Sequence, residues 1–531
     1  ALAAGNTVIL KPASSAVLVA YELCCCFWEA GVSRRVLQFF PCSGGGVGSQ
    51  LVSDARVDVV ILTGGTSTAL QMLKKRPNMN LLAETGGKNA TIVTGLSDRE
   101  QAIKHILHSA FSHSGQKCSA TSLLILEDEV YEDERFKKML CDAVHSLVVG
   151  SAWRLHSKLG PMINPPSGDL ETALKELEAG ETWGVMPEQV DNNPSLYSAG
   201  LKWGVQPGGY THMTEFFGPV LGVMRCKNIQ HAIELVNQTG YGLTSGLESL
   251  DEREQNIWRE GIRAGNLYVN RPTTGAVVQR QPFGGMGKSA FGPGIKAGGP
   301  NYVAQLMSFE EEQSLQAESD LSQLDPEMMQ LQIDLAEYFS GDKEQCVRLK
   351  RMFSSFDLYC RSELLVSHDD VRLVGQDNIR RYRPVEMLRI RVQPEDSDFD
   401  VIARVVAAKM VGCRTTVSIP DGLSLDLIDK LDHFTQDWGA CIEFVFESDE
   451  VLIELVQAKQ MDRLRYAHPS RVPTAIHQAA GPLGIFIASA PPLSEACLEL
   501  LWYVFEQSVS FDYHRYGNLG RRGSEPRREV L

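Results

Sequence analysis

The feature that most limits the fold of this chain is the alternation of apolar strands and helices over its first 84 residues. Short apolar runs such as NTVIL and VDVVILT are each followed by a longer segment with helical spacing of apolar residues. This alternation predicts a parallel, doubly wound α/β sheet. Glycine-rich turns at 44–48 and 64–66 lead from strand to helix and can present N–H groups to phosphates. Neither turn has the full G-x-G-x-x-G fingerprint, so a plain turn remains an alternative for each.

The remainder of the chain divides by composition and pattern. Residues 85–268 are again mixed α/β, and residues 269–308 are dense in glycine with little helix or strand character. Long loops of that kind inside a compact protein are usually functional or disordered, and the apolar and aromatic residues in this one favour order. Residues 309–329 form an acidic linker, and residues 330–531 return to helix and strand alternation.

Composition narrows the class of protein. The net charge is −15, and no block rich in lysine or arginine precedes the last dozen residues, so a nucleic-acid partner is not expected. No apolar run is long enough to span a bilayer, and no signal peptide is visible. The 12 cysteines show neither disulfide-framework nor CxxC spacing. They indicate reduced thiols in a cytoplasmic protein without a metal site.

The chain begins at Ala1, within the helical segment ALAAG and without a preceding cap signal. We therefore expect that a part of the natural protein precedes this residue.

One cysteine, Cys118, lies between a helix and a strand. The segment REQAIKHILHSAF has apolar residues at helical spacing, Gly115 ends it, and TSLLIL reads as a buried strand. Backbone N–H groups in such a connection are free to stabilise a thiolate, together with the nearby Lys117. The same groups could stabilise an oxyanion on a substrate bonded to the sulfur. An unreactive loop cysteine is the alternative.

Two glutamates stand out beside glycine turns. Glu84 closes an apolar strand and precedes Thr-Gly-Gly, where a partly buried carboxylate is suited to act as a general base. Glu215 precedes two aromatic residues and a Gly-Pro turn. A carboxylate there could hold ribose hydroxyls, with Phe217 against the ring that they carry. For Glu84, a solvated loop charge is the alternative.

These residues belong to a set of motifs that resembles a known family. NTVILKPA, LLAETGGKNA, SHSGQKCSA, EFFGPVLGV and QPFGGMGKSAFGP, in this order and spacing, resemble the aldehyde dehydrogenase superfamily over roughly residues 1–305. The resemblance implies an aldehyde dehydrogenase fold. Residues 1–84 would belong to a Rossmann-like NAD-binding domain that is truncated at its N-terminus, and residues 85–268 to the catalytic domain. Residues 269–308 would carry a substrate-anchor loop.

The resemblance also implies roles for individual residues. Cys118 matches the nucleophile that forms a thiohemiacetal and then a thioester, and Glu84 matches the base that activates water for deacylation. Lys11 and Glu215 match the residues that hold the two cofactor ribose groups, with Phe217 beside the nicotinamide ribose. Gly64, Gly65 and Thr66 match the pyrophosphate turn. The oxyanion-hole asparagine of the family would lie before Ala1, so the chain as given is expected to be a poor catalyst or none.

Other motifs resemble one subfamily. CSA after the nucleophile, TTGAVVQRQPFGG and KAGGPNY resemble the glutamate-semialdehyde (1-pyrroline-5-carboxylate) dehydrogenases, including the dehydrogenase half of the proline utilization A flavoproteins. There the α-carboxylate is held by a serine and by backbone N–H groups, which map to Ser119, Gly275 and Ala276, with Phe283 nearby. Fixed donors of this kind favour a carboxylated aldehyde. For Gly275, a plain turn remains the alternative.

The same resemblance implies NAD as the cofactor. Ser14 stands where many NAD-using relatives have an acidic residue, so use of NADP is left open. FAD is expected only if a proline dehydrogenase domain precedes Ala1. Relatives are mostly dimers or larger, so a homo-oligomer is expected.

Two other functions stay open at this level. An aldehyde dehydrogenase that transfers its acyl group to coenzyme A would generally lack the water-activating glutamate, whereas Glu84 is present. A non-catalytic scaffold relative is disfavoured by the presence of both Cys118 and Glu84.

Residues 330–531 contain a faint echo of the beginning of the chain. ARVVAAKMVGCRTTVSIP resembles ALAAGNTVILKP, since a small-residue helix ends at a glycine and a strand then runs to a proline. Ile419 precedes that proline where the first copy has Lys11, and neither the cysteine loop nor the Glu-Thr-Gly-Gly turn is repeated. We therefore expect a non-catalytic C-terminal α/β domain, similar to that of the longer proline utilization A proteins, which packs on the catalytic domain or replaces an oligomer contact.

Overall fold

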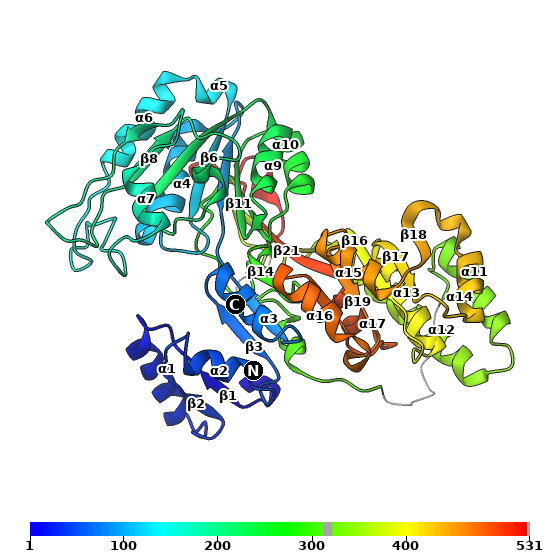
Figure 1. Ribbon diagram of the computed structural model, residues 1–531. Helices are drawn as coiled ribbons and strands as arrows, with labels where there is room; N and C mark the ends of the chain where they lie inside the picture. Colours follow the sequence, from blue (N-terminus) through cyan, green and yellow to red (C-terminus); the bar gives the residue numbers. More distant parts are fainter. Residues whose placement is uncertain (312–320, 528–531) are drawn as a thin grey trace.

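The structure is a computed structural model that describes residues 1–311 and 321–527 (Figure 1). Its first 84 residues alternate strand and helix as predicted, but they do not form one sheet. β1 pairs in parallel with β2 as a separate two-stranded sheet, and β3 pairs in parallel with β4. β14, from the glycine-rich segment, adds to β4 in antiparallel orientation. These elements are β1 (Val8–Leu10), α1 (Val17–Glu29), β2 (Leu37–Phe39), α2 (Val47–Ser53), β3 (Val60–Thr63), α3 (Thr66–Lys75), β4 (Leu81–Glu84) and β14 (Ala290–Phe291).

The largest sheet has nine strands in the order β15-β21-β12-β11-β5-β6-β9-β8-β7. Apolar residues of α9 and α10 pack on one face of this sheet and those of α4 and α6 on the other. The strands and helices from the middle of the chain are α4 (Arg99–Phe111), β5 (Asn89–Val93), β6 (Thr121–Glu127), α6 (Glu134–His145), β7 (Thr182–Val185), β8 (Gly200–Trp203), β9 (Val220–Cys226), α9 (Ile229–Gln238), β11 (Thr244–Glu248), α10 (Glu252–Gly261) and β12 (Asn266–Val269).

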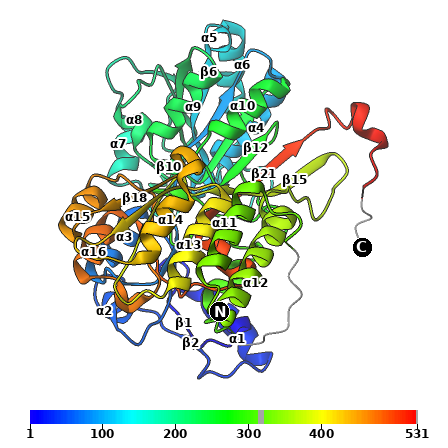
Figure 2. The same cartoon turned by 90° about the vertical axis from the view of Figure 1, so that its right-hand side faces the viewer.

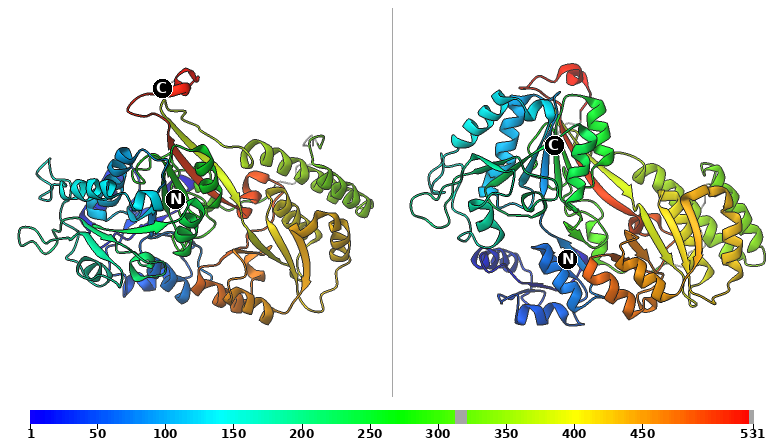
Figure 3. Two further views of the ribbon diagram at one scale, coloured as in Figure 1. Left: turned by 90° about the horizontal axis from the view of Figure 1, so that it is seen from above. Right: turned by 45° about the horizontal axis from the view of Figure 1, so that its top comes forward.

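Two strands from the region after residue 330 complete this sheet. β21 (Val504–Asp512) pairs in parallel with β12, and β15 (Gln376–Pro384) pairs with β21 in antiparallel register along its whole length. Figure 3 shows these long strands running side by side between the two halves of the molecule. The C-terminal part is therefore joined to the middle part of the chain by backbone hydrogen bonds within this sheet, a pairing between distant segments that periodicity cannot reveal.

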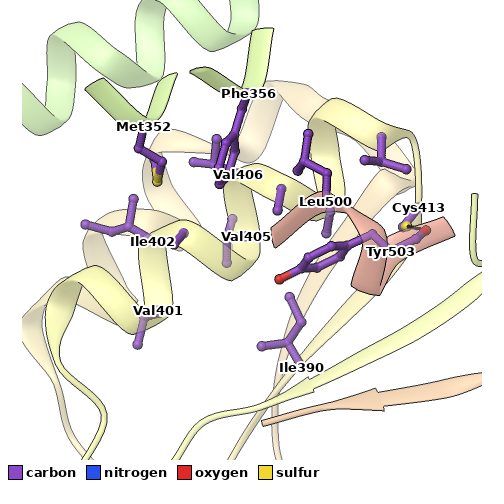
Figure 4. Packing of buried hydrophobic residues seen from close by; sticks show 14 of the residues in the cluster. Met352, Phe356, Ile390, Val401, Ile402, Val405, Val406, Cys413, Leu500 and Tyr503 are labelled. Carbon is purple, nitrogen blue, oxygen red and sulfur yellow. Dashed lines mark hydrogen bonds between the residues drawn. The ribbon is translucent and has the colours of Figure 1, made fainter. Parts of the chain in front are cut away.

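The rest of the C-terminal part forms a five-stranded parallel sheet in the order β18-β17-β16-β19-β20. Figure 2 shows its helices α11, α12 and α13 on one side. The core between helices and sheet includes Phe356, Val405 and Ile390, all fully buried (Figure 4). The elements are α11 (Pro326–Tyr338), α12 (Lys343–Tyr359), β16 (Met387–Arg391), α13 (Asp398–Val411), β17 (Arg414–Ile419), α14 (Asp426–Phe434), β18 (Ile442–Phe446), α15 (Asp449–Gln457), β19 (Arg463–Arg465), α16 (Thr474–Ala480), β20 (Phe486–Ala488) and α17 (Ala496–Glu499).

The acidic linker expected at 309–329 is described only in part, because residues 312–320 lie outside the described residues. At its start, Glu311 forms an ion pair of 2.7 Å with Arg348. Among the described residues, no helix is long and apolar enough to cross a membrane, and no cluster of three or more metal-ligating side chains occurs.

Candidate active site

Cys118 lies in the short connection between a helix and a strand, as the sequence predicted. A single 3₁₀ turn (Ser112–Gly115) follows α4, and β6 begins three residues after the cysteine. Gly115 has a φ of +70°, and a Cβ on it would lie 2.2 Å from the carbonyl oxygen of Gly218. This close approach requires glycine and fixes the cysteine connection against the segment that carries Glu215.

The backbone around Cys118 is held by Asn89, the first residue of β5. The Asn89 Nδ2 group donates to the carbonyl oxygens of Cys118 and Ala120, at 2.7 and 2.9 Å, and its Oδ1 accepts from the N–H of Thr244 at 3.0 Å. Asn89 is buried, so losing these bonds would leave several polar groups unpaired. Sequence reasoning missed this residue, although it lies in the quoted motif LLAETGGKNA.

Burial raises the pKa of the Cys118 thiol, and the Glu84 carboxylate raises it further. The backbone N–H groups of Ser119 and Cys118 act in the opposite direction and lower this pKa. The backbone N–H groups therefore lower the pKa of Cys118 as expected, whereas Lys117 is not among the main causes of the shift in this pKa.

Glu84 ends β4 in buried surroundings. Its Oε2 accepts a hydrogen bond from the N–H of Gly285 at 2.8 Å. Burial raises the pKa of Glu84 to about 7, against the opposing effects of the Lys296 ammonium and the Gly285 N–H. A carboxyl group with a pKa near neutrality can both take up and release a proton. Lys296, another residue that sequence reasoning missed, is fully buried, and burial lowers its pKa to about 8.

Glu215 lies against the glycine turn that follows Glu84. Its Oε1 accepts from the N–H of Gly87 at 2.9 Å, and a Cβ on Gly86 would lie 1.8 Å from its Oε2. Burial raises the pKa of Glu215, and the Lys88 ammonium opposes this shift. The Lys88 Nζ is buried and lies 4.3 Å from the centre of the Phe216 ring. Gly86 is thus required for the carboxylate to approach the backbone.

The predicted cofactor residues are spread over three places. Lys11 lies directly after β1, and its Nζ donates to the carbonyl of Pro12 at 2.9 Å. Gly65 is the N-cap of α3 and provides no side-chain cap, and Gly64 precedes it. The Thr66 Oγ1 donates to the carbonyl of Lys288 at 2.9 Å, next to Thr85. Phe217 is 41% exposed with a φ of +54°. The structure therefore brings the start of α3 close to Glu84, while Lys11 lies at the end of β1, next to the separate two-stranded sheet.

The loop that carries two of the predicted substrate residues, Gly275 and Ala276, is tied to the cysteine connection through Thr273. The Thr273 Oγ1 donates to the carbonyl oxygen of Ser119 at 3.1 Å, which ties the two segments together. Gly275 has a φ of +92°, and both Gly275 and Ala276 are exposed. Within the described part of the chain, the N–H groups of these two residues are not donated to any protein acceptor. Two free N–H groups on one loop can bind an anion such as a carboxylate.

Phe283 lies in the turn that covers Glu84. It is half-buried and exchanges two backbone hydrogen bonds with Ala297, at 2.9 and 3.1 Å. A Cβ on the next residue, Gly284, would lie 2.5 Å from the Glu84 Oε1. Phe283 is therefore close to the base, on the glycine-rich segment that also carries Gly275.

Comparisons with known proteins agree with these motifs. The sequence pattern that defines the Aldehyde dehydrogenase family matches residues 1–311. A 1-pyrroline-5-carboxylate dehydrogenase from Geobacillus thermodenitrificans is 34% identical over 314 residues, which cover 57% of this chain and 60% of the relative. The bifunctional protein PutA of Salmonella typhimurium is 37% identical over 326 residues, 58% of this chain and 24% of the relative.

Solved structures extend the likeness to the C-terminal part. Proline utilization A from Corynebacterium freiburgense matches 97% of this chain and 48% of its own length, with a TM-score of 0.80 and 35% identity. A Thermus 1-pyrroline-5-carboxylate dehydrogenase with bound NAD matches 57% of this chain and 59% of its own, with a TM-score of 0.53 and 33% identity. The chain thus spans less than two thirds of the length of each of these relatives.

Proposed function

The chain belongs to the aldehyde dehydrogenase family, and from this premise we propose that it oxidises L-glutamate γ-semialdehyde, the open form of 1-pyrroline-5-carboxylate, to L-glutamate with NAD. The observation that carries the substrate assignment is the pair of free N–H groups at Gly275 and Ala276. They lie on the loop that Thr273 ties to Ser119, the residue after the nucleophile. This arrangement supports an aldehyde that carries a carboxylate. The relatives named 1-pyrroline-5-carboxylate dehydrogenase support the same substrate.

The proposed reaction begins at Cys118. Its sulfur attacks the aldehyde carbon, and the proton that the thiol loses is taken up by the carbonyl oxygen, which becomes the hydroxyl of a thiohemiacetal. The N–H groups of Cys118 and Ser119, which lower the pKa of the thiol, also stabilise negative charge on that oxygen. A bound NAD would supply the acceptor for the hydride that leaves the carbon. Loss of this hydride and of the hydroxyl proton converts the thiohemiacetal into a thioester at Cys118.

Glu84 then completes the reaction. As a carboxylate it takes a proton from a water molecule, and the resulting hydroxide attacks the thioester carbon. The carbon–sulfur bond breaks, the product leaves as glutamate, and Cys118 recovers its proton. The pKa of about 7 that burial gives Glu84 allows both forms of the carboxyl group to be populated at neutral pH.

The residues of this chain fit part of an NAD site. The ten-residue helix α3 begins without a side-chain cap, so its first N–H groups are free for a pyrophosphate. Glu215 is held by Gly87 and is suited to accept hydrogen bonds from ribose hydroxyls, with Phe217 beside it. Lys11 would hold the other ribose. Because Ser14 brings no negative charge, we leave use of NADP open.

We further propose that the C-terminal five-stranded sheet is not catalytic. The carboxyl ends of its strands, where a doubly wound fold usually binds ligands, are occupied by ion pairs. The buried Arg404 pairs with the fully buried Asp396, and the buried Arg391 pairs with Asp449. No position of this sheet repeats the Cys118 and Glu84 arrangement. The role of the C-terminal part is to pack on the catalytic part and to supply β15 and β21 to the nine-stranded sheet.

The proposal is tested by measuring NADH formation in the intact protein with glutamate semialdehyde, with hexanal, and with glutamate semialdehyde plus coenzyme A. Glutamate semialdehyde should be preferred over hexanal by at least about 100-fold in kcat/KM, because hexanal leaves the anchor N–H groups unpaired. Coenzyme A should not accelerate turnover. Equal use of the two aldehydes would overturn the substrate assignment, and a requirement for coenzyme A would identify an acyl-transferring enzyme instead.

A further inference from the structure

The loop that carries the two free N–H groups is fixed at both ends. On its N-terminal side, the N–H of Thr273 donates to the Ser109 Oγ at 3.0 Å. On its C-terminal side, the N–H of Val277 donates to the Gln281 Oε1 at 2.8 Å. Gly275 and Ala276 lie between these two anchors. The position of their N–H groups therefore depends on where the Gln281 side chain is held.

Gln281 is held by the C-terminal part of the chain. Its side-chain amide is buried, and its Nε2 donates to the Asn378 Oδ1 and, at 3.5 Å, to the Gln376 Oε1. Both acceptors lie on β15. The amide of Gln281 therefore connects this strand to the substrate loop. Its nitrogen donates to β15, and its oxygen accepts from the N–H of Val277.

Asn378 is itself fixed by hydrogen bonds to two strands. Its Oδ1 also accepts from the Ser510 Oγ of β21 at 3.0 Å, and its Nδ2 donates to the Gln376 Oε1 at 3.0 Å. Asn378 is 3% exposed and Ser510 is fully buried. A buried polar network in which every member has partners is rigid, and removal of one member leaves the others unpaired.

The strand register places this network beside the reaction centre. Asn378 is paired with Ser510 in the ladder of β15 and β21, and Ser510 is paired with Tyr268 in the ladder of β21 and β12. Tyr268 is buried and close enough to Cys118 for the cysteine to raise its pKa. We refer to the hydrogen-bonded side chains of Asn378 and Gln281 as the link. The link therefore lies between the C-terminal strands and the nucleophile, on the face of the sheet that carries the substrate loop.

We propose that Gln281 and Asn378 are positioning residues that make substrate selection by the dehydrogenase site depend on the C-terminal strands. The link fixes the Gly275–Ala276 N–H groups for the carboxylate of the aldehyde substrate. Neither side chain takes part in the chemistry at Cys118. This inference rests on the proposed function, since it requires that the loop binds a carboxylate.

The test compares two variants of the link with a matched control. Asn378→Leu and Gln281→Met keep side-chain size and remove the hydrogen bonds. Gln507→Met is the control, because Gln507 is a buried amide on β21 with two side-chain bonds, to Arg381 and to the carbonyl of Ala264, at 2.8 Å each. Its odd offset from Ser510 places it on the opposite face of the strand.

The readout is the ratio of kcat/KM for glutamate semialdehyde to kcat/KM for hexanal, in the intact protein. Both link variants should lower this ratio by about 10- to 100-fold, mainly through KM for the semialdehyde, because a small displacement of positioning groups costs that much. Use of hexanal and the Kd for NAD should stay within about twofold. The double variant should be no worse than the more severe single variant, because both changes break one link. Gln507→Met should leave the ratio unchanged even where it lowers Tm.

An unchanged ratio in the link variants, or a parallel loss of activity with both aldehydes, would overturn the inference. If Asn378→Leu does not fold, Gln281→Met decides the question alone. An unaltered protein that shows no preference for glutamate semialdehyde would instead overturn the proposed function, so the two failures are distinguishable.

Discussion

Replacement of Glu84 by glutamine should separate the two chemical steps of the proposed reaction. Glu84→Gln keeps the shape of the side chain and can still accept the bond from the Gly285 N–H, but it cannot take a proton from water. Acylation of Cys118 should still produce a burst of NADH of about one equivalent per active site, followed by slow turnover. Loss of a positioned base should slow deacylation by about 100- to 10,000-fold.

The raised pKa of Glu84 also predicts how strongly the deacylation rate of the unaltered protein depends on pH. With the pKa of Glu84 raised to about 7 by burial, roughly nine tenths of the carboxyl group is ionised at pH 8 and one tenth at pH 6. Base catalysis requires the ionised form, so the deacylation rate should fall as the pH falls through 7, by about tenfold between pH 8 and pH 6. In Glu84→Gln this decline should disappear from the slow phase.

Stopped-flow measurement of NADH in the intact protein resolves the burst from the steady state. A deacylation rate that is equal at pH 6 and pH 8 would refute the raised pKa as the source of the pH dependence. Loss of the burst together with turnover would show that the first step cannot proceed without the Glu84 carboxylate, or that the glutamine disturbs the site, and a cofactor-binding measurement on the same variant distinguishes these outcomes.

Three further predictions address other parts of the site. Cys118→Ala should abolish NADH formation and leave the Kd for NAD nearly unchanged by fluorescence titration; activity within about tenfold would contradict the covalent step. Gly86→Ala places a Cβ 1.8 Å from the Glu215 Oε2, so it should raise the Kd for NAD far more than it changes Tm, and an unchanged Kd would contradict the ribose assignment. Truncation after residue 308 removes β15 and β21 and exposes the edge of β12, so it should lower solubility and activity while Cys118 still reacts with a thiol reagent, and full activity of the truncated protein would contradict the packing role.

Local patterns predicted much of the site. Apolar periodicity placed Cys118 between α4 and β6, and the strand-ending position of Glu84 predicted a partly buried carboxylate next to a glycine turn. These features depend on residues that are close in sequence. The family motifs added the expectation that Ser119 and the Gly275 loop act on the same substrate group. The bond from Thr273 to the Ser119 carbonyl is consistent with this expectation.

Contacts between distant segments could not be predicted in the same way. The addition of β21 to β12, and the hydrogen bond from Gln281 to Asn378 that depends on it, join segments separated by about 100 to 240 residues, and no periodicity records such a pairing. The division of the first strands into two sheets was also missed, because alternation of strands and helices predicts parallel pairing but not which strands pair. Asn89 was missed because its partners are backbone carbonyls, which the sequence does not distinguish.

The most direct test of the account is the identification of the covalent intermediate. Glu84→Gln in the intact protein would be mixed with NAD and glutamate semialdehyde, quenched with acid, digested and analysed by mass spectrometry. The account predicts one glutamyl group in thioester linkage on the peptide that contains Cys118, and none on the other 11 of the 12 cysteines. Absence of this adduct while NADH is formed, or its presence on another cysteine, would contradict the assignment of Cys118 as the nucleophile.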